Sequence, residues 1–282
     1  MSGEGDGVKG LVENPRASVT AQAGGRLLVR VRLPRATSAH PRLLLQPRPK
    51  KGRPEEAGRS LVLEPVGTDE WQTVVETDPA LDEGRWDAYV VSGPGEDRVP
   101  LLPGPRDLRG LVSGGDAERR APVAVRIPYA TKDGRLAIRA WRRATHAEAG
   151  RITVAADAMT VSARLYGAGL GEGAEVSLNR RGRESAVARF ALSAEGDQDF
   201  SFTVAYPDLL AEAAGGTAVV WDVFVHPSAG APRVRVARLM DDVADRKTVF
   251  VYPTTTLGGV SVRPYYTLDN DLSVEIAPRP SR

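Results

Sequence analysis

The stretch Trp86–Val91, Trp-Asp-Ala-Tyr-Val-Val, decides the fold because it returns 135 residues later as Trp221–His226, Trp-Asp-Val-Phe-Val-His. A second stretch, Pro128–Ile138, returns as Pro264–Val274 at an offset of 136 residues. Two unrelated patterns that recur in the same order at nearly the same offset predict an internal duplication. A feature shared by both copies is then a structural one, and a feature confined to one copy is a candidate for a private role.

Hydrophobic residues alternate with polar ones along most of the chain. Leu27–Leu33 carries apolar side chains at every second position, and Val161–Leu165 repeats the pattern in the second copy. Short alternating segments separated by Gly, Pro and Asp turns are typical of β-sandwiches. We therefore predict an all-β fold of two tandem immunoglobulin-like β-sandwiches from an internal duplication, with Trp86 and Trp221 in their cores.

The duplication also sets the expected domain limits. We expect a disordered leader over residues 1–15, the first sandwich over 16–148, the second over 149–278 and a tail over 279–282.

Each copy ends in a predicted hairpin, Val123–Trp141 in the first and Val260–Ile276 in the second. The hairpins turn at Asp133-Gly134 and Asp269-Asn270, which are residues suited to the positive φ of a tight turn. Each hairpin either completes its own sandwich or lies across the junction between the two copies.

Composition excludes several classes of protein. The chain has 282 residues, 41% of them hydrophobic and 26% charged, as in a globular protein of two domains. It has no cysteine, which removes disulfides, thiolate metal sites and cysteine nucleophiles. No apolar run is long enough to span a membrane and the leader lacks a signal-peptide core, so we expect a cytoplasmic protein. A net charge of +2 gives no reason to expect nucleic acid as a partner.

Catalytic motifs are missing or have a structural explanation. The chain has three histidines and no Gly-x-Ser-x-Gly elbow. The glycine-rich run Gly167–Gly173 precedes a predicted strand, whereas a phosphate-binding loop must open a helix. Asp269-Asn270-Asp271 resembles a metal-binding Asp-x-Asp, but its counterpart Asp133-Gly134-Arg135 indicates a shared turn. We therefore predict no catalytic residue, no cofactor and no metal site.

Two sets of residues are candidates for ligand binding. A basic turn recurs between the same two strands of each copy, as Arg48, Lys50, Lys51 and Arg53 and as Arg180, Arg181 and Arg183. Clustered cations of this kind bind phosphate or carboxylate groups, and they are also what a solvated turn normally carries. Tyr129, Tyr265 and Tyr266 adjoin the repeated proline and either form a sugar-stacking platform or pack the hairpin onto its sandwich.

The motif Gly-x-Trp-Asp-x-Tyr-Val (Gly84–Val90) with the later Pro-Tyr-x-Thr-x-Asp-Gly-x-Leu-x-Ile hairpin (Pro128–Ile138) resembles a known family of accessory regions. These β-sandwich regions follow the catalytic domain of bacterial glycosyltransferases and glycerophosphotransferases that make cell-wall polymers. The resemblance implies tandem immunoglobulin-like domains that act in oligomerisation or polymer binding. The nucleotide-sugar domain of such enzymes is missing here. The preference for arginine over lysine, with abundant Ala, Gly, Val and Pro, is typical of a GC-rich actinobacterial genome.

These observations favour a non-catalytic binding or assembly module of the cell-envelope glycopolymer machinery. Its expected partners are an anionic glycopolymer or a glycosyltransferase, and a homo-oligomer is a further possibility. Two alternatives stay open: a structural protein that pairs with another chain through its sheet edges, and a transferase-like enzyme with an unrecognised carboxylate site.

Overall fold

A computed structural model describes residues 15–33, 40–49, 52–92, 97–113, 121–210 and 217–279. Strands dominate, and the helical elements are one 3-10 turn (η1, Ala23–Gly25) and two four-residue helices, α1 (Arg109–Val112) and α2 (Pro207–Leu210). The all-β prediction is confirmed. The predicted leader and tail lie outside the described residues, apart from one residue each.

The first half of the chain forms two sheets. The five-stranded sheet has the order β5-β6-β2-β1-β9. Its strands are β1 (Arg16–Ala21), β2 (Leu27–Arg32), β5 (Glu64–Pro65), β6 (Glu70–Val75) and β9 (Leu102–Asp107).

The six-stranded sheet has the order β10-β11-β7-β3-β4, with β8 paired to β7. Its strands are β3 (Arg42–Pro47), β4 (Arg59–Val62), β7 (Gly84–Val91), β8 (Val99–Pro100), β10 (Val123–Ala130) and β11 (Leu136–Arg143). Alternate residues of both sheets, such as Val29 from the first and Leu45 from the second, meet in one hydrophobic core.

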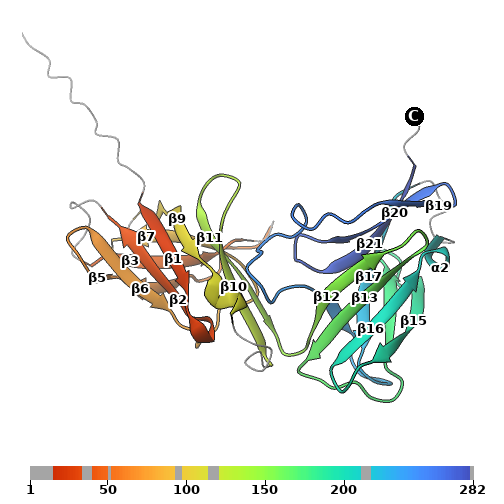
Figure 1. The fold of residues 1–282 in the computed structure, drawn as a ribbon. Coiled ribbons are helices and arrows are strands. Elements are labelled where there is room, and N and C mark those ends of the chain that lie inside the picture. The colour runs from red at the N-terminus through yellow and green to blue at the C-terminus, as the bar shows by residue number, and fades with distance from the viewer. Residues whose placement is uncertain are drawn as a thin grey trace, which may run out of the picture.

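The second half forms a single ten-stranded sheet, β14-β15-β16-β13-β12-β18-β17-β21-β20-β19. An additional β14–β17 pairing closes the seven strands from β14 to β17 in this order into a ring and leaves β21, β20 and β19 outside it. The strands are β12 (His146–Val154), β13 (Ala158–Tyr166), β14 (Glu175–Arg180), β15 (Val187–Ala194), β16 (Asp199–Ala205), β17 (Val219–His226), β18 (Val234–Ala237), β19 (Thr255–Leu257), β20 (Val260–Tyr266) and β21 (Leu272–Pro278). Figure 1 shows the two halves side by side, with β10, β11 and β12 near their junction.

Strand pairing in the second half repeats that of the first. The Trp-Asp strand β7 lies between β3 and β11, and its counterpart β17 lies between β14 and β21. Trp86 pairs with Ile138, and Trp221 pairs with Val274, which is the equivalent residue at the offset of 136. In both halves the first strand also pairs in parallel with a late one, β1 with β9 and β12 with β18.

The predicted hairpins and their turns are confirmed. β10 and β11 pair antiparallel around Gly134, and β20 and β21 do so around Asn270. Gly134 has a φ of 72° and Asn270 a φ of 61°, which is the left-handed region that the sequence predicted for both turns. The predicted boundary after residue 148 falls inside β12, which runs continuously from the end of the first half into the second.

The two repeated tryptophans are core residues, as predicted. Trp86 is 7% exposed and Trp221 is 2% exposed. Trp86 packs in the core of the first half and Trp221 in that of the second. The indole Nε1 of Trp86 donates to the carbonyl oxygen of Asp82 at 3.0 Å.

We expect Trp86→Ala and Trp221→Ala each to lower the free energy of unfolding by about 3–5 kcal/mol, because each removes a large buried side chain and leaves a cavity. Urea denaturation followed by circular dichroism measures the change, and Val249→Ala at an exposed position is the control. Unfolding midpoints equal to the control's would show that the indoles do not hold the cores together.

Candidate functional site

In each half, one arginine of the predicted basic turn is joined to the aspartate of the Trp-Asp motif. Arg48 donates to Asp87 from Nε at 3.1 Å and from Nη2 at 2.5 Å. Arg181 donates to Asp222 in the same way, at 3.2 and 2.6 Å. Such two-point contacts between guanidinium and carboxylate fix the orientation of both groups. The contact is shared by both copies, so its first role is structural.

The predicted tyrosines divide into two kinds. Tyr129 and Tyr265 are half-buried. Each interacts with the arginine that binds the Trp-Asp aspartate of its own half, Tyr129 with Arg48 and Tyr265 with Arg181. Tyr266 is fully buried and packs against Phe250 and Tyr252 at ring distances of 6.0 and 6.1 Å. The expectation that Tyr266 stacks on a sugar is corrected, because its ring belongs to the core.

The remaining basic-turn residues differ in their exposure. Lys50 and Lys51 lie outside the described residues. Arg53 and Arg183 are exposed, while Arg180 is half-buried, and both Arg180 and Arg183 take part in further contacts.

The outward face of the first hairpin is covered by the second half of the chain. Ile127 and Trp141, on β10 and β11, pack against Ala237 and Leu239. Trp141 is only 1% exposed. The connection is also held by Glu148, which accepts hydrogen bonds from the backbone N–H groups of Leu239 and Met240 at 2.8 and 3.0 Å. The first hairpin therefore lies across the junction and, through the pairing of β11 with β7, also completes the sheet of its own half, so both predicted arrangements are present together.

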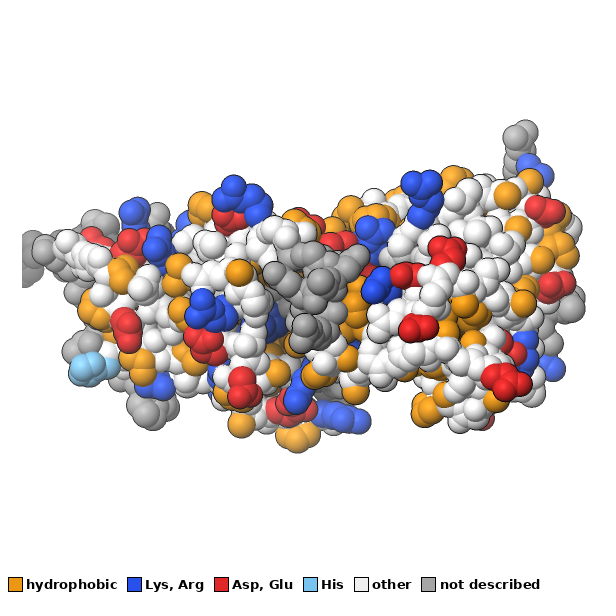
Figure 2. Space-filling view, turned by 60° about the horizontal axis from the view of Figure 1, so that its bottom comes forward, with side chains coloured by type: hydrophobic (Ala, Val, Ile, Leu, Met, Phe, Trp, Pro, Cys, Tyr) orange, Lys and Arg blue, Asp and Glu red, His pale blue; other side chains and the backbone are white. Residues whose placement is uncertain are grey.

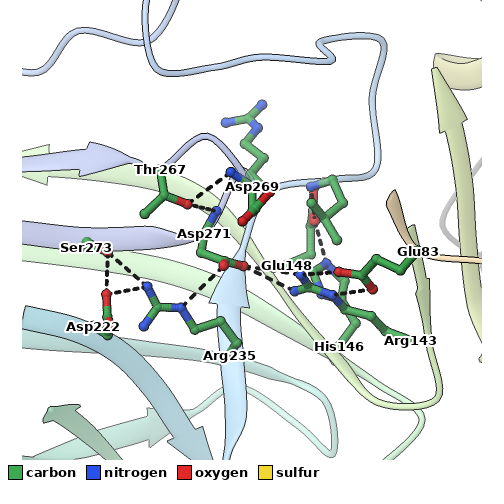
Figure 3. Close-up of polar contacts among 12 residues, drawn as sticks. Glu83, Arg143, His146, Glu148, Asp222, Arg235, Thr267, Asp269, Asp271 and Ser273 are labelled. Atoms are coloured by element: carbon green, nitrogen blue, oxygen red, sulfur yellow. Dashed lines mark hydrogen bonds and ion pairs between the residues drawn. The ribbon is translucent and has the colours of Figure 1, made fainter. Parts of the chain in front are cut away.

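Two arginines of β11 form ion pairs with the Asp-Asn-Asp turn of the second half. Arg139 donates to Asp269 at 2.5 Å, and Arg143 donates to Asp271 at 3.3 Å and to Glu83 at 3.1 Å. Figure 3 shows Glu83, Arg143 and Asp271 as a continuous chain across the junction. Both aspartates thus have cationic side-chain partners. In the described part of the chain, no group of three or more His, Cys, Asp or Glu side chains is placed to hold a metal ion.

Asp271 also interacts with a second arginine, Arg235 of β18. The Nε atom of Arg235 lies 3.7 Å from Asp271, and its Nη2 atom donates to Asp222 at 2.7 Å and to Ser273 at 2.9 Å. Burial raises the pKa of the Asp271 carboxyl above its ordinary value, although Arg143 and Arg235 oppose this. Burial acts on Asp222 too, but the Arg181 hydrogen bond and the Arg235 charge outweigh it, and the pKa of Asp222 is lowered.

Beside this network lies a hollow of about 420 Å³, here called the arginine hollow. Three guanidinium groups line it, from Arg143 of the first half and from Arg233 and Arg235 of the second. Thr145 and Ser228 add hydroxyl groups, and the described residues around it include no carboxylate. Part of the wall is Ala168 and Gly169, from the glycine-rich run, which here connects two strands as predicted.

Two arginines of the hollow sit on an aromatic ring. The guanidinium carbons of Arg233 and Arg235 lie 4.5 and 4.9 Å from the ring centre of Phe224. Such contacts hold the cations in place without using their N–H donors. The Nη1 atom of Arg235 is buried and makes no hydrogen bond among the described residues. A buried guanidinium N–H without a partner is costly, and the contacts of the other Arg235 nitrogens with Asp222 and Asp271 offset part of that cost.

Sequence reasoning missed all three arginines of the hollow. Arg143 is more than 85 residues away from the other two in the chain, and only the docking of the two halves brings them together.

A serine and a histidine also meet in the second half. The Oγ atom of Ser177 lies 2.9 Å from Nε2 of His226 and 2.9 Å from Oδ1 of Asn179. Burial lowers the pKa of His226, which keeps its ring neutral. Ser177 is only 1% exposed, so a substrate has no access to its hydroxyl group. The pair does not constitute a nucleophilic site.

Comparison with known proteins gives little further information. No family model matches the chain, and no curated protein matches it. Among solved structures, the crystal structure of S. aureus TarS is similar with a TM-score of 0.38 and 13% sequence identity, over 55% of this chain and 28% of that chain. The crystal structure of S. aureus TarS 217–571 gives a TM-score of 0.37 and 13% identity, over 69% of this chain and 45% of that chain.

The surface gives two further facts. Among the described residues, no helix has the length and apolar character needed to cross a membrane. Figure 2 shows acidic and basic side chains interspersed over one face of the molecule, with no broad field of one sign. The three arginines of the hollow are thus a local feature and not part of a generally basic face, and two of them, Arg143 and Arg235, are paired with carboxylates outside its lining.

We expect Asp222→Asn and Asp271→Asn to change the acid sensitivity of folding in opposite directions. The lowered pKa of Asp222 contributes stability above its ordinary value of 3.8 that is lost as the pH falls through the folded-state pKa. The raised pKa of Asp271 makes the folded state take up its proton first, which offsets part of the acid destabilisation. Asp222→Asn should therefore lose less unfolding free energy on acidification than the wild type, and Asp271→Asn should lose more.

Urea denaturation at about pH 7 and about pH 3 measures both losses. Asp97→Asn, at an exposed site, is the matched control. If the loss of unfolding free energy on acidification differs from that of the control in the same direction in both variants, this account of the network is wrong.

Proposed function

We propose that this protein is a non-catalytic binding module that holds an anionic polymer of the cell envelope at the arginine hollow. The observation that carries the proposal is the composition of that hollow: three guanidinium groups, two hydroxyl groups and no carboxylate among its described lining residues. Arginine presents planar donors that match phosphate and carboxylate oxygens. Arg143 and Arg235 are already paired with carboxylates, so Arg233 is the cation that an anionic ligand would compensate.

The hollow is suited to one anionic group of a longer molecule. It is formed jointly by the two halves. Arg233 is exposed, and among the described residues its guanidinium contacts only the ring of Phe224, so its N–H donors are available to a ligand.

The wider setting of the proposal rests on the sequence. We propose that each half is an immunoglobulin-like sandwich derived from one duplicated ancestor, in keeping with the repeated strand pairing. The likeness of Gly84–Val90 and Pro128–Ile138 to accessory regions of cell-wall glycosyltransferases supports a place beside that machinery. A cytoplasmic location, a glycosyltransferase partner and homo-oligomerisation stay predictions.

We expect Arg233→Ala to weaken the binding of short-chain polyphosphate about tenfold, because a hydrogen bond to a charged group contributes about 1.5–3 kcal/mol and 1.4 kcal/mol is one decade. Isothermal titration calorimetry measures the affinity, with polygalacturonate as a carboxylate polymer and dextran as a neutral one. Binding should fall as the salt concentration rises past about 0.15 M, where the screening length is about 8 Å.

The control for this test is Arg180→Ala with Arg183→Ala, which removes two cations of the predicted basic turn and leaves the hollow intact. If the double variant loses affinity and Arg233→Ala does not, the basic turn is the anion site and the proposal is wrong. Equal binding of dextran and polyphosphate would also overturn it.

A further inference from the structure

A second hollow, here called the Trp86 hollow, lies in the first half of the chain near the junction. Its volume is about 240 Å³. Trp86, Pro47 and Pro49 supply an apolar wall, and Gly84 adds a stretch of wall without a side chain. This volume lies below the usual range for drug-sized ligands and suits one small ring.

Charged groups of both signs surround this apolar wall in equal number. Three are arginines, namely Arg48, Arg85 and Arg139, and three are carboxylates, namely Glu56, Asp82 and Glu83. The Trp86 hollow therefore differs from the arginine hollow, because neither an anion nor a cation gains a net electrostatic preference in it. Hydroxyl groups use both kinds of side chain at once, since each donates to a carboxylate and accepts from a guanidinium.

Several of these groups have hydrogen-bonding capacity that the protein leaves unused. The side chain of Arg139 is 7% exposed, and its buried Nε atom has no hydrogen-bond partner among the described residues. The exposed carboxylate of Glu56 makes no hydrogen bond or ion pair within that same part of the chain. Asp82 has only a distant ion pair, at 3.9 Å from Arg142.

We infer that the Trp86 hollow binds a single neutral sugar ring. The apolar wall would take the C–H face of the ring, and the alternating donors and acceptors would take its hydroxyl groups. This deepens the proposed function and rests on it in one respect, namely that the ring and the anion belong to one polymer.

The two hollows are physically linked. Glu83 lines the Trp86 hollow, and its carboxylate accepts from Arg143, which lines the arginine hollow, at 3.1 Å. An ion pair therefore joins the walls of the two hollows. The inferred ligand is a glycosylated polyanion, with its sugar at Trp86 and its charge at Arg233.

The Trp86 hollow is private to the first half. At the offset of the repeat, Arg139 corresponds to Glu275 and Arg85 to Val220. The second half therefore lacks two of the three guanidinium groups, and one sugar site per chain is expected.

Saturation-transfer NMR with methyl β-D-glucopyranoside, methyl β-D-galactopyranoside and N-acetylglucosamine tests the inference on the full chain. We expect at least one of these sugars to bind with a stoichiometry of one. Its affinity should fall about tenfold in Arg85→Ala and in Glu56→Gln, since each removes a hydroxyl partner. Arg106→Ala and Glu64→Gln, at exposed positions away from both hollows, are the matched controls.

Two variants separate this inference from the proposed function. Arg233→Ala should leave the binding of the methyl glycoside unchanged and weaken that of polyphosphate, whereas Glu56→Gln should do the reverse. No binding of any of the three sugars, or sugar binding that is insensitive to both Arg85→Ala and Glu56→Gln, would overturn the inference. Preferential binding of a zwitterion such as glycine betaine at the same residues would overturn it too. A wild-type chain that binds a sugar at these residues but does not bind polyphosphate would contradict the proposed function and leave the inference about the Trp86 hollow standing.

Discussion

The apolar seam around Trp141 is the contact on which the arrangement of the two halves depends. Trp141 and Ile127 on the first hairpin are buried against Ala237 and Leu239 of the second half. Burial of such side chains contributes about 25 cal/mol per Å² of apolar surface. That contribution is what allows charged groups to be buried beside the seam. A buried ion pair by itself gives little net stability, because desolvation of the charges offsets their attraction. The ion pairs of the two arginines with the Asp-Asn-Asp turn therefore set the register of the junction, and the apolar seam supplies the stability of the junction.

The function that we propose depends on this docking. The arginine hollow takes Arg143 from the first half and Arg233 and Arg235 from the second, so neither half contains it alone. Asp271 lies at the centre of the arrangement, because it neutralises part of the charge of Arg143 and Arg235. Without such a carboxylate, adjacent guanidinium groups in a partly buried site would repel one another. The protein thus holds a cationic surface ready at modest electrostatic cost.

The sequence predicted the features that repeat and missed those that depend on tertiary contact. The strands, the hairpins, the positive φ at Gly134 and Asn270 and the burial of both tryptophans follow from local pattern and from duplication. The two-point contact between Arg48 and Asp87 was not predicted. The sequence did indicate it, because both partners recur together in the second copy as Arg181 and Asp222. The arginine hollow left no such signal. Its members come from distant segments, and an arginine on a strand reads in isolation as an ordinary solvent-facing residue.

The docking face of the first hairpin is not repeated on the second. The seam positions Val125, Ile127 and Trp141 correspond at the repeat offset to Ser261, Arg263 and Ala277. Arg263 instead forms an ion pair with Glu275 at 2.9 Å, a partly exposed contact that water accommodates easily. The outward face of the second hairpin has therefore lost the apolar surface that docks the first. On the other side of the junction, Asp271 is private to the second copy, where the first has Arg135. The junction thus uses an apolar face from the first hairpin and Asp271 from the turn of the second, and neither has a counterpart in the other hairpin.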